Sequence, residues 1–300
     1  MNISILGAGA IGLLFSARLA KSGHNIRIIT HHQKQADHIN QNGITCHDPN
    51  QSMNAYVTAS ADPSIGIKSD CWILTVKQYQ LKELQPVIES ISYHTPIIFT
   101  QNGMGHLEFM ESLPHSQLFV STVEHGASKE SSTTVHHNGI GRWQIAPFKG
   151  EKEKLKELLT INNSDFPILF RQEYYHMLLE KLIKNIMINS LTAIFRVPNG
   201  ELIRNPYLRN LLHDLYLEMI LIFPEAKSFL SIQQVESLCI KTAENTSSMN
   251  ADLQQGRKTE VDSILGFAIN VASQKGVRTP LLHFLNKAIC GLEFREGIRS

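Results

Sequence analysis

The chain of 300 residues carries 28 Lys and Arg against 27 Asp and Glu, so it lacks the basic excess of nucleic-acid-binding proteins. Hydrophobic residues make up 42% of the sequence, which is ordinary for a soluble globular protein, and the length allows two domains. The N-terminus has no basic signal-peptide segment, and the longest apolar stretch is too short to span a bilayer. The four scattered cysteines form no C-x-x-C pair. We therefore expect a cytoplasmic protein with reduced thiols and with no membrane or nucleic-acid partner.

The N-terminal segment combines a short apolar strand with a glycine fingerprint. Residues 2–6 are typical of a strand and run directly into Gly7-Ala8-Gly9-Ala10-Ile11-Gly12. A helical pattern to Lys21 and a second strand over 25–30 follow. A strand–turn–helix–strand unit of about 30 residues is the context in which this fingerprint binds a dinucleotide. The glycines permit the tight turn, the approach of a pyrophosphate and close packing of helix on strand, while the helix N-terminus offers N–H groups to the phosphates.

The end of the second strand bears on the choice of nicotinamide cofactor. NAD-binding units usually carry an Asp or Glu there, which holds the ribose 2′-hydroxyl. Here the sequence is Thr30-His31-His32-Gln33-Lys34, without a carboxylate that would repel a 2′-phosphate. Lys34 and one or both histidines are able to attract that phosphate, so NADP(H) is the expected cofactor. The alternative is that the histidines are ordinary loop residues and that selectivity is poor.

Strand and helix patterns alternate through the first half of the chain and predict a mostly parallel sheet covered on both faces. Helices are expected at 33–42 and 79–91, and residues 133–147 are typical of short antiparallel strands that close the domain. The strands are expected at residues 3–6, 26–30, 71–76, 97–100 and 118–123.

From about residue 174 onward the apolar spacing is helical almost throughout. We therefore expect an α/β protein with a Rossmann-type doubly wound sheet in residues 1–170 and an all-helical domain in residues 171–300. Ligands of such sheets bind at the carboxyl ends of the strands, which predicts an active site in the cleft between the domains. The helices are expected at 177–195, 208–223, 232–249 and 259–275.

One helical segment carries a polar stripe. Lys181, Asn185 and Asn189 are spaced four residues apart, so they share one face of a helix that is otherwise rich in Ile, Leu and Met. Asparagine is a poor helix former, so this pattern needs a reason. One reading is a buried amide pair that joins helices. The other is a substrate site in which two amides fix polar groups and one ammonium delivers a proton.

Three further polar segments and one lysine, Lys77, are considered as candidates for function. Asn102 lies in Gln101-Asn102-Gly103-Met104-Gly105, directly after a strand, where cofactor and substrate meet in this class of fold. Lys77 follows the preceding strand and is either a surface lysine or a cofactor contact. The run 244–249 is polar in a helical setting, whereas the charge-rich run 257–262 is by itself more typical of a solvated turn.

Together these segments resemble the 2-dehydropantoate 2-reductases (ketopantoate reductases) over nearly the whole chain. The glycine fingerprint alone is generic to dinucleotide folds, but the ordered set at these separations is specific. In the first half the matching segments are Gly7-Ala8-Gly9-Ala10-Ile11-Gly12, Thr75-Val76-Lys77, Gln101-Asn102-Gly103-Met104-Gly105 and His125-Gly126-Ala127. In the second half they are Lys181-Leu182 with Asn185 and Asn189-Ser190-Leu191-Thr192-Ala193, Pro198-Asn199-Gly200-Glu201-Leu202, Glu244-Asn245 with Ser247-Ser248-Met249, and Lys258-Thr259-Glu260-Val261-Asp262.

The resemblance implies reduction of 2-dehydropantoate to (R)-pantoate with NADPH, a step toward pantothenate and coenzyme A. It implies that Lys181 acts as the general acid and that Glu260, the second catalytic residue, contacts the substrate hydroxyl. It implies substrate contacts at Asn102, Asn185, Asn189, Asn245 and Ser248. It implies cofactor contacts at Gly7, Ala8, Gly9, Ala10, Ile11, Gly12, His31, Lys77, Asn102, Ala127 and Glu260. No metal is expected, and a monomer and a homodimer are both compatible with the sequence.

One departure from the family pattern concerns the cofactor. A family member that can be compared has an arginine at the position of His31, and histidine does not reproduce the fork of donors with which arginine grips a 2′-phosphate. Preference for NADPH over NADH is therefore expected to be reduced or to depend on pH. Two alternative functions are also compatible with the sequence: reduction of another branched 2-oxo acid, and a non-catalytic NADP(H)-binding sensor.

Overall fold

The computed structural model describes residues 1–48, 51–161 and 164–299. The chain forms two compact units. The first comprises Met1–Gln101 and Leu107–Tyr174, and the second comprises Asn102–His106 and the chain from Tyr175 onward. The short Asn102–His106 segment therefore belongs with the helical unit, although it directly follows a strand of the first.

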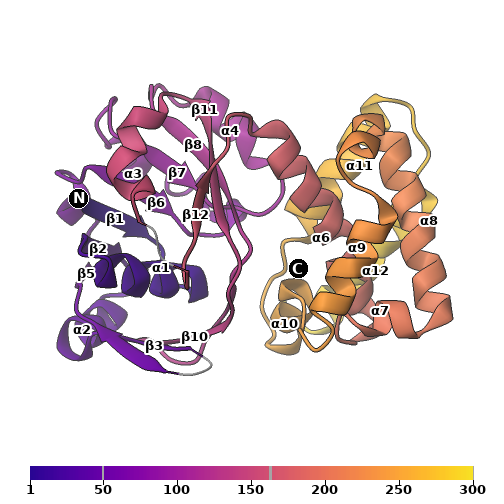
Figure 1. Cartoon of the computed structure of the whole chain (residues 1–300), viewed down its shortest axis with the longest axis horizontal. Helices are drawn as coiled ribbons and strands as arrows, with labels where there is room; N and C mark the ends of the chain where they lie inside the picture. The colour runs from indigo at the N-terminus through magenta and orange to yellow at the C-terminus, as the bar shows by residue number, and fades with distance from the viewer. Residues whose placement is uncertain (49–50, 162–163, 300) are drawn as a thin grey trace. The chain divides into compact units, whose positions relative to one another are not determined.

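An eight-stranded sheet forms the centre of the first unit (Figure 1). Its spatial order is β12-β11-β8-β7-β6-β1-β2-β5, and all pairs from β5 to β8 are parallel, as is the β11–β12 pair. Strand β11 is antiparallel to β8. The strands span Asn2–Leu6 (β1), Asn25–Ile29 (β2), Thr58–Ser60 (β5), Cys71–Leu74 (β6), Ile97–Phe99 (β7), Leu118–Val123 (β8), Trp143–Lys149 (β11) and Ile168–Phe170 (β12).

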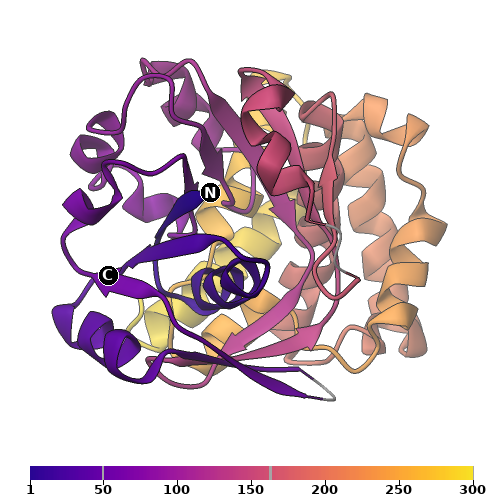
Figure 2. The same cartoon turned by 60° about the vertical axis from the view of Figure 1, so that its left-hand side comes forward.

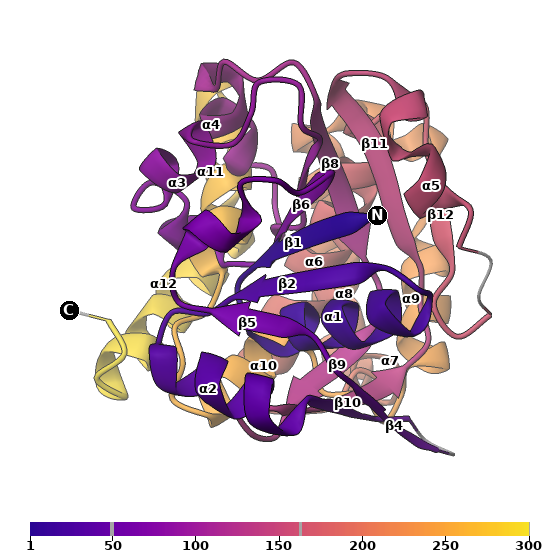
Figure 3. The ribbon, with the colours of Figure 1, turned by 90° about the vertical axis from the view of Figure 1, so that its left-hand side faces the viewer.

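Helix α1 (Ala10–Lys21) lies between this sheet and a second, four-stranded sheet (Figures 2 and 3). Ile3 and Ile5 of β1 share a buried hydrophobic cluster with Leu13 and Leu14 of α1. The second sheet has the order β4-β3-β10-β9, so segments far apart in the sequence meet beside α1. Its strands span Ile44–His47 (β3), Ser52–Ala55 (β4), Gly126–Lys129 (β9) and Thr134–Gly139 (β10).

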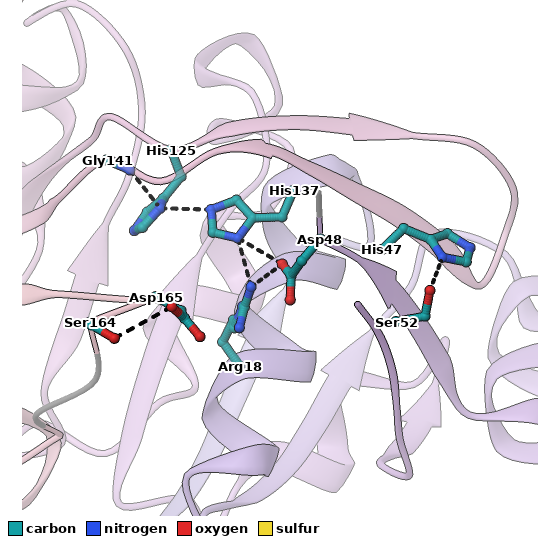
Figure 4. Close-up of polar contacts among 9 residues, drawn as sticks. All are labelled: Arg18, His47, Asp48, Ser52, His125, His137, Gly141, Ser164 and Asp165. Carbon is teal, nitrogen blue, oxygen red and sulfur yellow. Dashed lines mark hydrogen bonds and ion pairs between the residues drawn. The ribbon is translucent and has the colours of Figure 1, made fainter. Parts of the chain in front are cut away.

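A buried polar network joins α1 to the second sheet (Figure 4). The fully buried guanidinium of Arg18 forms an ion pair with Asp48 and donates to His137 Nδ1 at 2.8 Å. His137 Nδ1 is thus an acceptor, so its Nε2 carries the proton and donates to His125 Nδ1 at 3.0 Å. Burial lowers the pKa of His137, and it lowers the pKa of His125 to about 3, so the His125 ring is neutral at physiological pH.

Short helical segments complete the first unit. Asp62 caps η1 by accepting from the Ser64 backbone N–H at 2.9 Å. The segments are η1 (Pro63–Gly66), α2 (Gln33–Asn42), η2 (Gln78–Gln80), α3 (Gln85–Glu89), α4 (His106–Ser112), η3 (Lys152–Leu155) and α5 (Lys156–Leu159), with α4 beginning in the segment that belongs to the helical unit.

The second unit is helical around α6, whose buried side chains are apolar except for Asn189, Ser190 and Thr192. Helices α8, α10 and α12 pack against it. The elements are α6 (Tyr175–Phe195), α7 (Glu201–Arg204), α8 (Pro206–Ile222), η4 (Pro224–Ser228), α9 (Ile232–Lys241), α10 (Ser248–Gln254), the π-helical turn η5 (Asp262–Gly266), α11 (Phe267–Gln274) and α12 (Pro280–Arg295). None of the helices described is both long and apolar enough to cross a membrane.

The predicted fold class is confirmed, and the strand predictions of the first half are correct to within two residues at each end. The predicted helix over 79–91 is wrong in extent: two short pieces form instead, because Pro86 lacks the N–H that a continuous helix requires. The pattern over 232–249 divides into α9 and α10, because Ser247 caps a new helix by accepting from the Asn250 N–H. Helix α12 and strands β3, β4, β5, β9 and β12 were not predicted.

Candidate functional site

The glycine turn after β1 is held by its neighbours on both sides. Gly7 has a φ of 113°, in the region that favours glycine, and its N–H donates to the Ile29 carbonyl at 2.9 Å. Thr75 at the end of β6 donates its hydroxyl to the Gly7 carbonyl at 2.9 Å. A Cβ built on Gly12 would lie 1.9 Å from that same carbonyl oxygen. The first turn of α1 therefore packs directly on the loop, which no larger residue at position 12 permits.

Gly9 is different, because a Cβ built there has no protein atom within 4 Å. It is the N-cap of α1 and supplies no side-chain cap for the N–H groups of the first turn. Space above a backbone turn together with N–H groups at a helix N-terminus is the combination that receives a pyrophosphate. The turn therefore fits the dinucleotide that the sequence predicts.

The end of β2 carries the two histidines that follow Thr30. Both rings are exposed, and His31 Nδ1 lies 3.0 Å from His32 Nε2. One of these nitrogens must accept the hydrogen bond without a proton of its own. At most one of the two rings is therefore charged while the bond holds, which limits the attraction that this pair offers to a phosphate.

The carboxyl ends of β6 and β7 are tied together by side chains. The buried amide of Gln101 donates to the Leu74 carbonyl at 3.0 Å and to the Val76 carbonyl at 2.9 Å. The half-buried Lys77 begins the η2 turn, and its backbone N–H donates to Gln80 Oε1 at 3.0 Å. Gln101 and Thr75 thus fix the loops on which the predicted cofactor contacts depend, a role that the sequence pattern did not predict for either residue.

Strand β9 brings two residues toward this region. Ala127 is half-buried and packs against the core cluster of the first unit. Lys129 donates from Nζ to the Ala8 carbonyl of the glycine turn at 3.0 Å. This contact spans 121 positions of the sequence, so no local pattern could have revealed it.

In the helical unit, the predicted stripe lies within one continuous helix, α6. Lys181 and Asn185 are half-buried, and Asn189 is buried. The Asn189 amide donates to the Ser248 hydroxyl at 3.3 Å, and this bond joins α6 to the first residue of α10. It is compatible with both readings of the stripe, since it fixes two predicted substrate contacts and also links two helices.

A second predicted pair also comes together in this unit. The Asn102 amide donates to Glu260 Oε2 at 2.8 Å, across 158 positions of the sequence. The adjacent Gly103 has a φ of 81°, and a Cβ built on it would lie 2.1 Å from the Ser263 carbonyl oxygen. The Asn-Gly loop is therefore pressed against the start of η5, which sets the position of the Asn102 side chain beside Glu260.

Glu260 is 6% exposed and its neighbours Thr259 and Val261 are also buried. The interpretation of 257–262 as a solvated turn therefore fits the exposed Arg257, Lys258 and Asp262 but not the three residues between them. Thr259 is anchored because its N–H and hydroxyl both donate to Glu293 Oε1 of α12, each at 2.7 Å.

Two further residues of the helical unit are Asn245 and His106. Asn245 is exposed, and its backbone carbonyl accepts from the Asn199 N–H at 3.1 Å. His106, which the sequence did not single out, is fully buried in the helical unit. Burial lowers the pKa of His106 to about 4 against the opposing charge of Glu260, so a neutral imidazole lies within the electrostatic reach of that carboxylate.

Comparison with known proteins decides the family. The model of the family "Ketopantoate reductase PanE/ApbA" matches residues 3–150, and that of its C-terminal domain matches residues 173–293. The chain belongs to the ketopantoate reductase family. The 2-dehydropantoate 2-reductase of Bacillus subtilis (strain 168) is 38% identical over 98% of both chains. Reductases of this family are oxidoreductases, and this chain is therefore an oxidoreductase.

Solved structures agree with this assignment. The probable 2-dehydropantoate 2-reductase panE of Bacillus subtilis superimposes with a TM-score of 0.85 at 35% identity and covers 98% of this chain and 100% of its own. A D-mandelate dehydrogenase solved with NADH and anilino(oxo)acetate has a TM-score of 0.88 over 100% of both chains. Its identity is 22%, so that likeness concerns the fold alone.

Proposed function

We propose that this chain reduces 2-dehydropantoate to (R)-pantoate with NADPH, in the biosynthesis of pantothenate and coenzyme A. The observation that carries the proposal is the polar set of the helical unit, in which Asn189 bonds Ser248 and Asn102 bonds Glu260, in a chain 38% identical to a 2-dehydropantoate 2-reductase. Residues 1–170 would form the cofactor domain and residues 171–300 the catalytic domain, and the cytoplasm would be the site of action.

The glycine turn, His31, Lys77 and Ala127 would hold the cofactor, which supplies the hydride when bound. The protein must then stabilise the negative charge that grows on the ketone oxygen and provide one proton. In this proposal the Lys181 ammonium does both: its charge lowers the barrier, and its proton passes to that oxygen as the alcohol forms. Hydride and proton together convert the ketone to the hydroxyl, so the reaction is balanced.

Orientation of the substrate would depend on the amides and on Glu260. Asn185, Asn189 and Ser248 offer neutral donors for the substrate carboxylate and hydroxyl, and Asn245 would add a further contact. Glu260 would accept from the substrate hydroxyl while it holds Asn102 by the 2.8 Å bond. Because a carboxylate accepts hydrogen bonds at both oxygens, Glu260 can keep Asn102 and still bind substrate.

The test compares two lysines of α6. Lys181→Ala is expected to lower kcat with 2-dehydropantoate by about 10²–10⁴-fold, the usual contribution of a general acid, while NADPH still binds. Lys184→Ala is the matched control: it removes the same group from the same helix, at a lysine that pairs with Glu180. Near-normal turnover in Lys181→Ala would remove this residue from the proposed role.

A panel of 2-oxo acids separates the proposal from its alternatives. A higher kcat/KM for 2-oxoisovalerate than for 2-dehydropantoate would favour reduction of another branched 2-oxo acid. The structural likeness to a D-mandelate dehydrogenase keeps that alternative worth testing, since one fold can serve several such acids. Binding of NADPH without turnover of any member of the panel would instead favour a non-catalytic sensor.

A further inference from the structure

We propose that Lys129 is the cation that binds the adenosine 2′-phosphate of NADPH and so compensates for the histidine at position 31. The inference rests on the proposed function, because it assigns a specificity-determining residue to the cofactor site of that reaction. Lys129 is the last residue of β9, is exposed, and donates to the Ala8 carbonyl at 3.0 Å. Within the described ranges it takes part in no ion pair, so its charge is not neutralised by a carboxylate.

The contact with Ala8 puts the ammonium on the β2 side of the glycine turn. Gln35 Nε2 donates to the same Ala8 oxygen at 3.0 Å, so this nitrogen and Lys129 Nζ are no more than about 6 Å apart. Gln35 belongs to the first turn of α2, which begins directly after the end of β2. In dinucleotide-binding folds the end of β2 is where the adenosine 2′ position is recognised.

The same amide also fixes the hairpin that carries Lys129. Gln35 Nε2 donates to the Ser132 carbonyl at 2.9 Å, and His38 of α2 lies 3.1 Å from the Ser132 hydroxyl. The connection between β9 and β10 is therefore attached to α2 at two points. Lys129 therefore lies on a hairpin whose position beside the predicted cofactor site is fixed by these contacts with α2.

The histidine pair by itself offers less positive charge than the 2′-phosphate carries, so a cation in addition to Lys34 would strengthen NADPH preference. A phosphate monoester carries about 1.5 to 2 negative charges near pH 7. His31 and His32 share one hydrogen bond at 3.0 Å and hold at most one positive charge between them. Partial burial lowers the pKa of Lys129. The Lys129 ammonium has three donors, of which the Ala8 carbonyl takes one. Lys129 can therefore bind phosphate oxygens without giving up its anchor.

The test measures binding, not turnover, with probes that differ only in the 2′-phosphate. Isothermal calorimetry with adenosine 2′,5′-bisphosphate and with 5′-AMP is combined with the Kd of NADPH and of NADH from nicotinamide fluorescence. Lys129→Met should weaken the bisphosphate and NADPH about tenfold or more, the size of one charge-assisted contact, and should leave 5′-AMP and NADH nearly unchanged. Lys129→Arg should keep most of the preference.

Two variants make the result interpretable. Lys129→Gln keeps a polar N–H donor at this position but has no charge, so it should lose the NADPH preference as Lys129→Met does. Lys68→Met removes a lysine that is also exposed, at a position after η1 in the same unit, and should change neither affinity. Retained preference in Lys129→Gln, or an equal loss for NADPH and NADH in Lys129→Met, would overturn the proposal, since either outcome would assign Lys129 to support of the turn.

The result of this binding experiment is independent of whether the proposed reaction is correct. If the protein turns over no 2-oxo acid but Lys129→Met selectively loses the bisphosphate, the reaction is wrong and the phosphate contact stands. If 2-dehydropantoate is reduced normally and the four ligands bind alike in Lys129→Met and wild type, the reaction stands and Lys129 is not the phosphate residue.

Discussion

Substitution of two glycines in one fingerprint by the same residue should weaken cofactor binding in both cases but lower stability in only one. In Gly12→Ala the new Cβ would lie 1.9 Å from the Gly7 carbonyl oxygen, about 1.5 Å inside the 3.4 Å at which ordinary contact begins. The obstacle is backbone, so the loop and α1 must move apart. Overpacking of this kind costs about 1–3 kcal/mol. At about 2 kcal/mol the melting temperature of a domain of this size falls by roughly 4–8 °C.

Gly9→Ala meets no such obstacle, because the built Cβ has no protein atom within 4 Å and the backbone is extended, with φ −81° and ψ −168°. Alanine is a poorer N-cap than glycine, but it also reduces the conformational entropy of the unfolded chain. These two effects are each below about 1 kcal/mol and oppose one another, so the melting temperature should hardly change. The methyl group would, however, occupy the space in which a pyrophosphate approaches, and NADPH affinity should fall at least tenfold, about 1.4 kcal/mol.

The assay pairs thermal unfolding of the ligand-free protein with NADPH titration for both variants and wild type. Gly12→Ala should lose stability and cofactor binding together, whereas Gly9→Ala should lose binding alone. If Gly9→Ala bound NADPH like wild type, the cofactor would not lie over this turn. If Gly12→Ala melted like wild type, the close packing of α1 on the loop would not be a constraint on the fold.

Two further predictions concern the buried network around α1. Asp48→Ala leaves the fully buried Arg18 guanidinium without its carboxylate and should cost about 3–5 kcal/mol in denaturant unfolding; a loss below about 1 kcal/mol would contradict a buried ion pair. The unfolded chain protonates His125 near 6.5, but the folded protein does so only near 3, so acid favours unfolding. Between these values His125 alone should lower stability by about 1.4 kcal/mol per pH unit as pH falls. His125→Asn should flatten the acid limb of the stability curve by that amount, and an unchanged limb would mean that the ring is charged in the folded state.

Much of the candidate site could be predicted because its signals are local in the sequence. The glycine fingerprint sits between a strand and a helix, and the spacing of Lys181, Asn185 and Asn189 puts them on one side of a helix wherever that helix lies. The alternation of strand and helix patterns also located strands β1, β2, β6, β7 and β8 and most helices, but it missed the parallel strands β5 and β12. Two helical patterns are interrupted in the structure. Pro86 lacks a backbone N–H, and Ser247 caps a new helix, and each effect overrides the hydrophobic spacing.

Contacts between distant segments were decided by the tertiary structure. In the helical unit, Asn102 bonds Glu260 across 158 positions of the sequence. In the first unit, Lys129 bonds Ala8 across 121 positions. No periodicity of the sequence relates either pair of segments. The four-stranded sheet over α1 has the same origin, since β3 pairs with β10 and both strands contact α1. The amino-acid sequence by itself determined the chemical groups and the local elements that carry them. Only folding decided which groups became partners, because pairing depends on distances in space that the one-dimensional pattern does not contain.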